Sequence, residues 1–176
     1  MSDQQVPSQI EVGANIQDGD LRLWQAKEAV RQGELRLAAQ AAIRTALEAR
    51  ATAITGWAAA SLLALAAATA ATTGVAPRVG AAAAGTFLFG AAGMCIHAAR
   101  PRNWAQAGYD PTVIMGDTLG TELEVLESVA EGISPGIQRN NTRLEGMGTL
   151  LRWSGWMLIA APFLGGIAYA VARAAT

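Results

Sequence analysis

The chain has 176 residues, of which 15 % are charged, and 13 Lys and Arg against 14 Asp and Glu leave a net charge of −1. The charged share lies well below the roughly 25 % of an ordinary soluble domain. The chain lacks the excess of positive charge that would favour nucleic-acid binding. A single cysteine, Cys95, and a single histidine, His97, exclude a disulfide framework and a Cys-rich or His-pair metal site. We therefore expect no metal ion and no cofactor.

The few charges are unevenly placed. Residues 51–77, 79–99 and 153–172 carry none, and a helix that crosses the hydrocarbon core needs roughly 20 mostly apolar residues. The alternative, a soluble bundle of buried Ala-rich helices, should show polar residues every third or fourth position, and only scattered Thr, Ser and Gly are present. We predict transmembrane helices over 51–76, 79–99 and 152–173.

Charged and aromatic residues flank these stretches, as expected for anchors at a membrane surface. The third stretch has both kinds at its start, whereas the first two are Ala-rich and would insert most easily as a hairpin closed at 75–78. The predicted membrane-interface anchors are Arg50, Arg100, Arg102, Trp104, Arg152, Trp153, Trp156 and Arg173.

Arginine placement predicts the orientation. Among the arginines that flank the predicted spans, eight lie on one side and two, Arg78 and Arg173, on the other. The eight are Arg36, Arg44, Arg50, Arg100, Arg102, Arg139, Arg143 and Arg152. Because positive residues favour the cytoplasmic side, we expect the N-terminus and residues 100–152 in the cytoplasm, the C-terminus in the periplasm, and the chain in a bacterial inner membrane.

The N-terminal part divides into a tail and a helix. Residues 1–17 are rich in Gln, Ser, Asn and Gly and predict a flexible tail. A cytoplasmic helix over 18–50, capped by Asp18 or Asp20, has Gly33 as its only interruption. Since nothing stops it before the membrane, we expect one helix from about residue 20 to about residue 74.

After the second span, residues 100–116 predict an interfacial loop and residues 117–151 a cytoplasmic heptad helix. Apolar residues step by four and three along that helix and form a stripe, called here the seam. Asn140 occupies a seam position, where it can fix register or simply meet water near a helix break. The seam comprises Leu119, Leu123, Leu126, Ala130, Ile133, Ile137, Asn140, Leu144, Met147 and Leu151.

Pro135 interrupts the heptad helix, and either a kink or a hairpin is expected there. The seam keeps its phase across Pro135, which favours the kink. In water the seam must be buried against another helix, either residues 21–50 of the same chain, running parallel, or another copy. Glutamates at 122, 124, 127 and 131 form a solvated face that can also pair with Arg22, Lys27, Arg31 and Arg36.

The residue types of catalysis are scarce. Cys95 and His97 are the only candidates inside a span, and two positions apart on a helix they point in different directions. His97 is either an interfacial side chain or a ligand or proton relay. We predict no catalytic residue. Small residues four apart indicate close helix packing in lipid; the pairs are Gly80/Ala84, Ala81/Gly85, Phe89/Gly93 and Ala161/Gly165.

Short motifs at the span boundaries are Glu48-Ala-Arg-Ala-Thr, Arg100-Pro101-Arg102, Asn141-Thr-Arg-Leu144 and Leu151-Arg152-Trp153. With this order of elements, residues 40–170 resemble the small helical membrane modules of prokaryotic nucleotide-signalled antiphage systems, namely the Pycsar transmembrane effectors and the two-helix SLATT domains. The family's Lys-Ala-Gly at the start of the first span is Glu48-Ala49-Arg50-Ala51 here, so no binding residue is carried over. The resemblance implies a membrane-perturbing or signalling effector.

Together these observations predict an all-α integral membrane protein with three transmembrane helices and a helical, coiled-coil-like cytoplasmic stalk. We expect it to be non-enzymatic and to self-associate. Its partners would be the lipid bilayer and a second copy or another membrane protein, not nucleic acid. Two other functions remain open: an accessory or scaffold subunit of a larger membrane complex, and a phage holin-like pore former.

Overall fold

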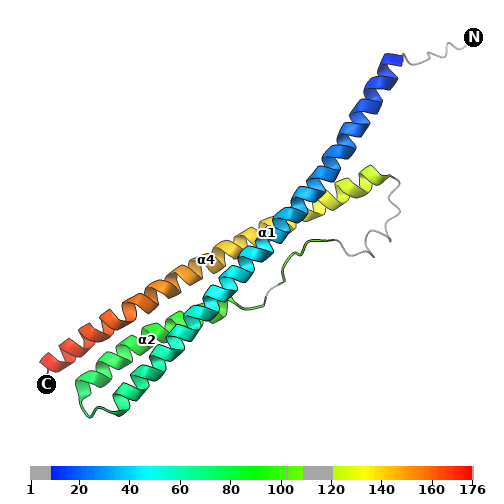
Figure 1. Ribbon diagram of the computed structural model, residues 1–176. Helices are drawn as coiled ribbons and strands as arrows, with labels where there is room; N and C mark the ends of the chain where they lie inside the picture. The colour runs from blue at the N-terminus through cyan, green and yellow to red at the C-terminus, as the bar shows by residue number, and fades with distance from the viewer. Residues whose placement is uncertain (1–8, 102, 109–120, 176) are drawn as a thin grey trace, which may run out of the picture. The chain divides into compact units, whose positions relative to one another are not determined.

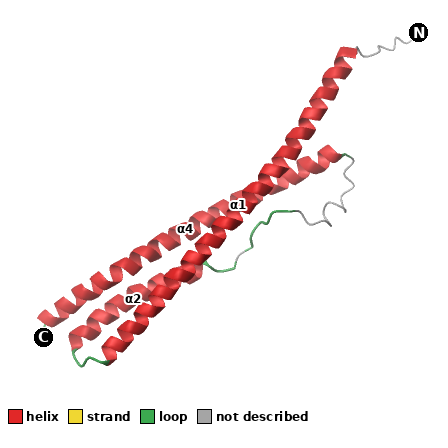
Figure 2. Cartoon of the chain, in the orientation of Figure 1, coloured by secondary structure: helices red, strands yellow, loops and turns green. Residues whose placement is uncertain are grey.

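The computed structural model describes residues 9–101, 103–108 and 121–175, and the side chains from Gly19 onward (Figures 1 and 2). Every secondary-structure element in these ranges is a helix: α1 (Gln9–Ala70), α2 (Val75–Ala98) and α4 (Glu122–Ala174). The predicted all-α class is therefore confirmed. Each helix contains a stretch long and apolar enough to cross a membrane, as predicted from the charge-free stretches.

The helices build two compact units. The polar unit contains Met1–Ala41 and Trp104–Asn140, and the apolar unit contains Ala42–Asn103 and Asn141–Thr176. Helices α1 and α4 contribute to both units, whereas α2 belongs to the apolar unit alone. The tail residues 1–8, Arg102, Leu119 and most of the expected loop lie outside the described residues.

Helix α1 departs from the prediction at both ends. It begins at Gln9 rather than near residue 20, because no proline separates residue 9 from the helix and the two acidic caps are not needed. It ends at Ala70, and the turn lies at 71–74 instead of 75–78. Pro77 sits in the first turn of α2, where its missing N–H has no intrahelical acceptor, so proline there starts a helix and does not break one.

Helix α4 continues through Pro135 and does not reverse there (Figure 1). The ring removes one backbone donor in the middle of the helix. The Pro135 carbonyl is still used, because it accepts a hydrogen bond from Arg139 Nε at 3.3 Å. Residues 122–140 therefore present one uninterrupted face to α1 within the polar unit.

In the polar unit, α1 and α4 run parallel and approach closely. Gly33 lies against Ile133, and a Cβ on Gly33 would come within 2.7 Å of Ile133 Cγ2. One heptad further along both helices, Gln40 meets Asn140. Leu37 is buried between these two contacts at 4 % exposure. Gly33 does not interrupt α1. Because it has no side chain, it lets the two helix backbones approach closely at Ile133.

In the apolar unit, all three helices share a core. Ala51 of α1, Cys95 of α2 and Leu151 of α4 are buried together, and Leu47, Ile54 and Ala99 pack around them. Farther along, α2 and α4 touch backbone to backbone: a Cβ on Gly80 would lie 2.8 Å from the Gly165 carbonyl oxygen. Small residues therefore set the spacing of α2 and α4.

Candidate functional site

The seam residues that the structure describes form the less exposed stripe of α4. Ile133, Asn140, Met147 and Leu151 are buried, whereas the other seam side chains are half-buried. The half-buried members are Leu123, Leu126, Ala130, Ile137 and Leu144. The partner of the seam in the polar unit is α1 of the same chain, as shown by the contact of Ile133 with Gly33.

The most polar buried site is an amide cluster around Asn140, whose exposure is 0 %. Its Nδ2 donates to Gln40 Oε1 at 3.1 Å and to the Ala105 carbonyl at 2.9 Å. Its Oδ1 accepts from the Ala105 N–H at 3.2 Å. Gln40 Nε2 donates in turn to the Ile137 carbonyl at 3.0 Å. The cluster thus joins α1, α4 and the segment at 103–108 within the polar unit.

Sequence reasoning identified Asn140 but missed Gln40 and Ala105. Asn140 was recognisable because it is polar at an apolar seam position. Gln40 carries no such signal, since it lies in a mixed polar helix and is buried only because α4 covers it. Ala105 acts through its backbone groups alone, which no side-chain pattern reveals.

Ion pairs lie on the exposed side of the polar unit. Arg22 pairs with Glu127 and Lys27 with Glu122, each at 2.9 Å, so two of the expected α1–α4 pairs are present. Arg31 instead pairs with Glu28 of its own helix at 2.7 Å. The Arg31 hydrogen bonds, helped by that from Gln32, lower the pKa of Glu28 from 4.5 to about 2. Exposed pairs of this kind contribute little to stability, because water and salt screen them. The Arg22–Glu127 and Lys27–Glu122 pairs therefore act mainly on the register of α1 against α4.

Cys95 and His97 occupy opposite environments on α2. Cys95 is 0 % exposed, and its thiol donates to Ser154 Oγ on α4 at 3.2 Å. Ser154 Oγ itself donates to the Leu151 carbonyl at 2.9 Å. The His97 side chain is exposed. Sequence reasoning found no partner for Cys95, because Ser154 lies on another helix. The contact is a packing contact in which the thiol is a weak donor.

Of the small-residue pairs, two face each other within the chain. Gly165 lies against Ala84 and Gly80, and Ala161 of the same helix is 1 % exposed. Phe89, in contrast, is 74 % exposed. The Gly80/Ala84 and Ala161/Gly165 surfaces are therefore occupied by α2–α4 packing within the chain.

Most predicted interface anchors lie on the surface of the apolar unit. Arg50, Arg100 and Arg152 are exposed, as are Trp153 at 59 % and Trp156 at 61 %. Arg173 donates to the Tyr169 hydroxyl at 3.4 Å. Trp104 differs, because it is half-buried and belongs to the polar unit.

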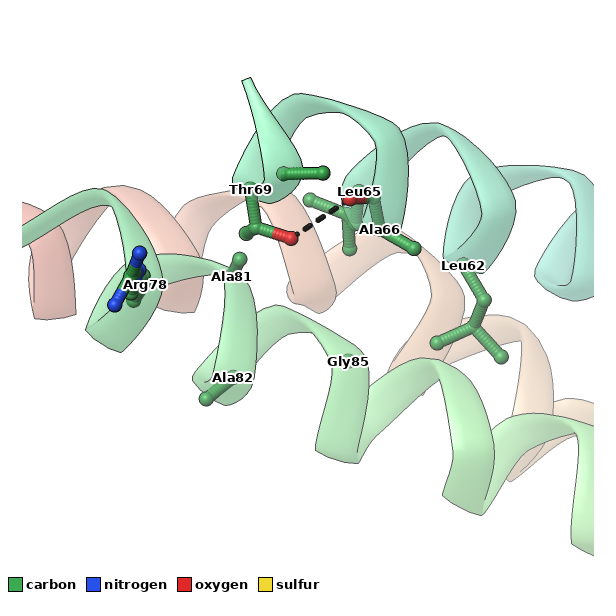
Figure 3. A pocket seen from close by; sticks show the side chains of 9 residues that line it. Leu62, Leu65, Ala66, Thr69, Arg78, Ala81, Ala82 and Gly85 are labelled. Carbon is green, nitrogen blue, oxygen red and sulfur yellow. Dashed lines mark hydrogen bonds between the residues drawn. The ribbon is translucent and has the colours of Figure 1, made fainter. Parts of the chain in front are cut away.

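The surface of the apolar unit contains grooves. One, of about 490 Å³, lies between the end of α1 and the start of α2 (Figure 3). It is lined by small and apolar side chains such as Leu62, Ala81 and Gly85, and Arg78 is the charged residue among the described lining residues. Another, of about 650 Å³, lies between α1 and α4 and has Arg50 and Arg152 in its lining.

Within the described ranges, no group of three or more His, Cys, Asp or Glu residues is placed to hold a metal ion. Comparisons of the chain with protein-family models, with curated proteins and with solved structures found no match. The features of this chain that bear on its function are therefore the amide cluster, the grooves and the exposed apolar surfaces.

Proposed function

We propose that the chain is a non-enzymatic, three-span inner-membrane protein whose cytoplasmic helix pair controls the packing of its spans. The observation that carries this proposal is that α1 and α4 are each a single helix containing both polar-unit and membrane-type residues. An uninterrupted helix transmits a shift or rotation along its axis, as helix movements do in known switches. A signal read by the helix pair would thereby reach the bilayer.

Self-association is the second part of the proposal. Large apolar side chains of the apolar unit remain exposed in the single chain, and in a bilayer they face lipid or a second copy. Because the Gly80 and Gly165 surfaces are already used within the chain, these larger side chains offer the remaining contact area. They include Trp57, Leu63, Phe89, Trp156, Phe163 and Ile167.

The proposed role is that of a membrane-perturbing or signalling effector, in line with the resemblance to antiphage membrane modules. Induced expression in cells loaded with a potential-sensitive dye tests it. We expect prompt depolarisation from the native chain and a much weaker response from Asn140→Leu at equal membrane abundance. Unchanged membrane potential at full abundance of the native chain would refute an effector role.

A second function, an accessory or scaffold subunit of a larger complex, is favoured by one specific observation. Leu21, Trp24 and Leu35 are 52 %, 62 % and 53 % exposed on α1 of the polar unit. Exposed apolar residues on a polar helix mark docking surfaces. A photo-crosslinking residue at Trp24 separates the cases: products of two identical chains support the effector, and a product with a different protein supports the subunit. Prompt cell lysis would support the holin-like function instead.

A further inference from the structure

The groove between α1 and α4 in the apolar unit combines apolar walls with two cationic side chains. Its apolar lining comes from Leu47, Ile54 and Trp57 of α1 and from Leu151 of α4. Arg50 and Arg152 contribute the charges, and no acidic residue is among the lining residues that the structure describes. Trp57 is 70 % exposed, so the groove is open along the side on which that ring lies.

Some other arginines of the chain have a carboxylate partner, which Arg50 and Arg152 lack among the described residues. Arg44 is paired with Glu48 at 2.7 Å and Arg22 with Glu127 at 2.9 Å. Within the described part of the chain, neither Arg50 nor Arg152 forms an ion pair with a carboxylate. Two positive charges on one acid-free groove create a local positive potential that attracts an anion.

Part of the apolar lining lies on the membrane side of the charge. Along α1, Ile54 and Trp57 follow Arg50 one and two turns later, in the direction of the predicted span, whereas Leu47 precedes it. A tryptophan at this level is typical of the boundary between lipid headgroups and hydrocarbon. The groove thus offers cations for a phosphate and, next to them, apolar surface for a chain of methylenes.

We propose that this groove binds one anionic phospholipid, with its phosphate at Arg50 and Arg152 and an acyl chain along Ile54 and Trp57. A phospholipid carries both an anion for the two arginines and an acyl chain that lies beside Ile54 and Trp57 in the bilayer, whereas a free phosphate or a nucleotide carries only the anion. The inference rests on the proposed membrane insertion.

The test uses the fluorescence of Trp57 in the full chain, reconstituted in phosphatidylcholine vesicles. Two samples are compared, and in each a minor share of the lipid is brominated. The brominated lipid is phosphatidylglycerol in one sample and phosphatidylcholine in the other. Bromine quenches the fluorescence of a tryptophan that it contacts. The signal of the Trp57→Phe variant is subtracted to isolate Trp57. We expect brominated phosphatidylglycerol to associate with the groove about fivefold more strongly than brominated phosphatidylcholine.

Matched variants locate the effect. Arg50→Gln combined with Arg152→Gln should abolish the preference. Arg100→Gln, which changes an exposed arginine just after the end of α2 and outside the groove, should retain it. Gly148→Leu should weaken it by filling the groove, because a Cβ on Gly148 meets nothing within 4 Å. Gly146→Leu is the control: its Cβ also meets open space, and Gly146 does not line the groove.

The outcomes separate this proposal from the proposed function. Equal quenching of Trp57 by both brominated lipids would overturn the lipid site while supporting membrane insertion. Absence of quenching by either lipid would overturn membrane insertion itself. A preference that survives loss of both arginines, or that inorganic phosphate abolishes, would also overturn the site, in the second case in favour of a soluble anion.

Discussion

Asn140 and Gln40 form a buried amide pair, with Asn140 Nδ2 donating to Gln40 Oε1 at 3.1 Å. Both side chains are almost fully buried, at 0 % and 6 % exposure. Each side-chain amide also forms hydrogen bonds with backbone groups. Gln40 bonds to the Ile137 carbonyl, and Asn140 bonds to both the N–H and the carbonyl of Ala105. A buried polar network whose members are all bonded specifies one alignment of its helices. This pair therefore fixes the register of α1 against α4 in the polar unit.

Replacing Asn140 with leucine tests that register. Asn140→Leu removes three hydrogen bonds. The Ala105 N–H, the Ala105 carbonyl and Gln40 Oε1 each lose the bond that they form with Asn140. Each buried polar group left unbonded costs about 1–3 kcal/mol, so we expect a loss of about 3 kcal/mol or more. Thermal unfolding of the full chain in detergent micelles measures it. Asn103→Leu, at an exposed asparagine nearby, should shift stability by less than about 0.5 kcal/mol.

Gly33 is predicted to be required by the close approach of Ile133. Gly33→Leu would force the two helices apart and should destabilise the chain by about 1–3 kcal/mol, despite the better helix propensity of leucine. Ile133→Ala in the same chain should restore part of the loss, because it removes the atom 2.7 Å from the new Cβ. Gly19→Ala, which meets nothing within 4 Å, should be neutral or stabilising. Additive losses in the double variant would contradict the contact.

Glu28 should titrate well below an ordinary glutamate. Its pKa is lowered to about 2, chiefly by hydrogen bonds from Arg31 and next by that from Gln32. A depressed carboxyl pKa stabilises the fold above the unfolded value of 4.5, and that contribution is lost as the pH falls through about 2. Carboxyl-carbon NMR of labelled Glu28 reads the midpoint. Arg31→Gln should raise the titration midpoint of Glu28, and Arg36→Gln should leave it unchanged. A midpoint near 4.5 in the native chain would contradict the two hydrogen bonds from Arg31 to the Glu28 carboxylate.

The thiol of Cys95 should matter slightly for stability. Cys95→Ala removes a buried group and its hydrogen bond to Ser154, which should cost about 1 kcal/mol. His97→Ala, two residues away with an exposed side chain, should have no measurable effect. Unfolding of the two variants in micelles gives the comparison. A larger effect of His97→Ala than of Cys95→Ala would reverse this assignment of roles.

Periodicity and charge predicted much of this architecture. The charge-free stretches correspond to the three membrane-type helices, and the seam residues within the described part are the less exposed face of α4. Both predictions depend on residue spacing along one helix, which the chain itself displays. The misplaced turn near Pro77 has another cause: proline both breaks helices and begins them, and the choice depended on Gly74 as the preceding cap.

The pairing of elements was beyond sequence reasoning. Gln40, Ala105 and Ser154 gain their roles only from residues on other elements, far along the chain. A stripe of apolar residues indicates that a face is buried but not what covers it, so the seam left the same chain and a second copy equally open. The Arg50–Arg152 groove was equally hidden, since the sequence indicated two separate anchors and not one shared surface.

Membrane topology tests the central claim most directly. In a Cys95→Ala chain, single cysteines at Gln5, Gln106 and Thr176 are labelled in intact inner-membrane preparations by a reagent that cannot cross the bilayer. The arginines that flank the spans, eight on one side and two on the other, predict that only the Thr176 position reacts from the periplasmic side, while Gln5 and Gln106 react only after the membrane is opened. Labelling of Gln106 from the periplasm would contradict the three-span account.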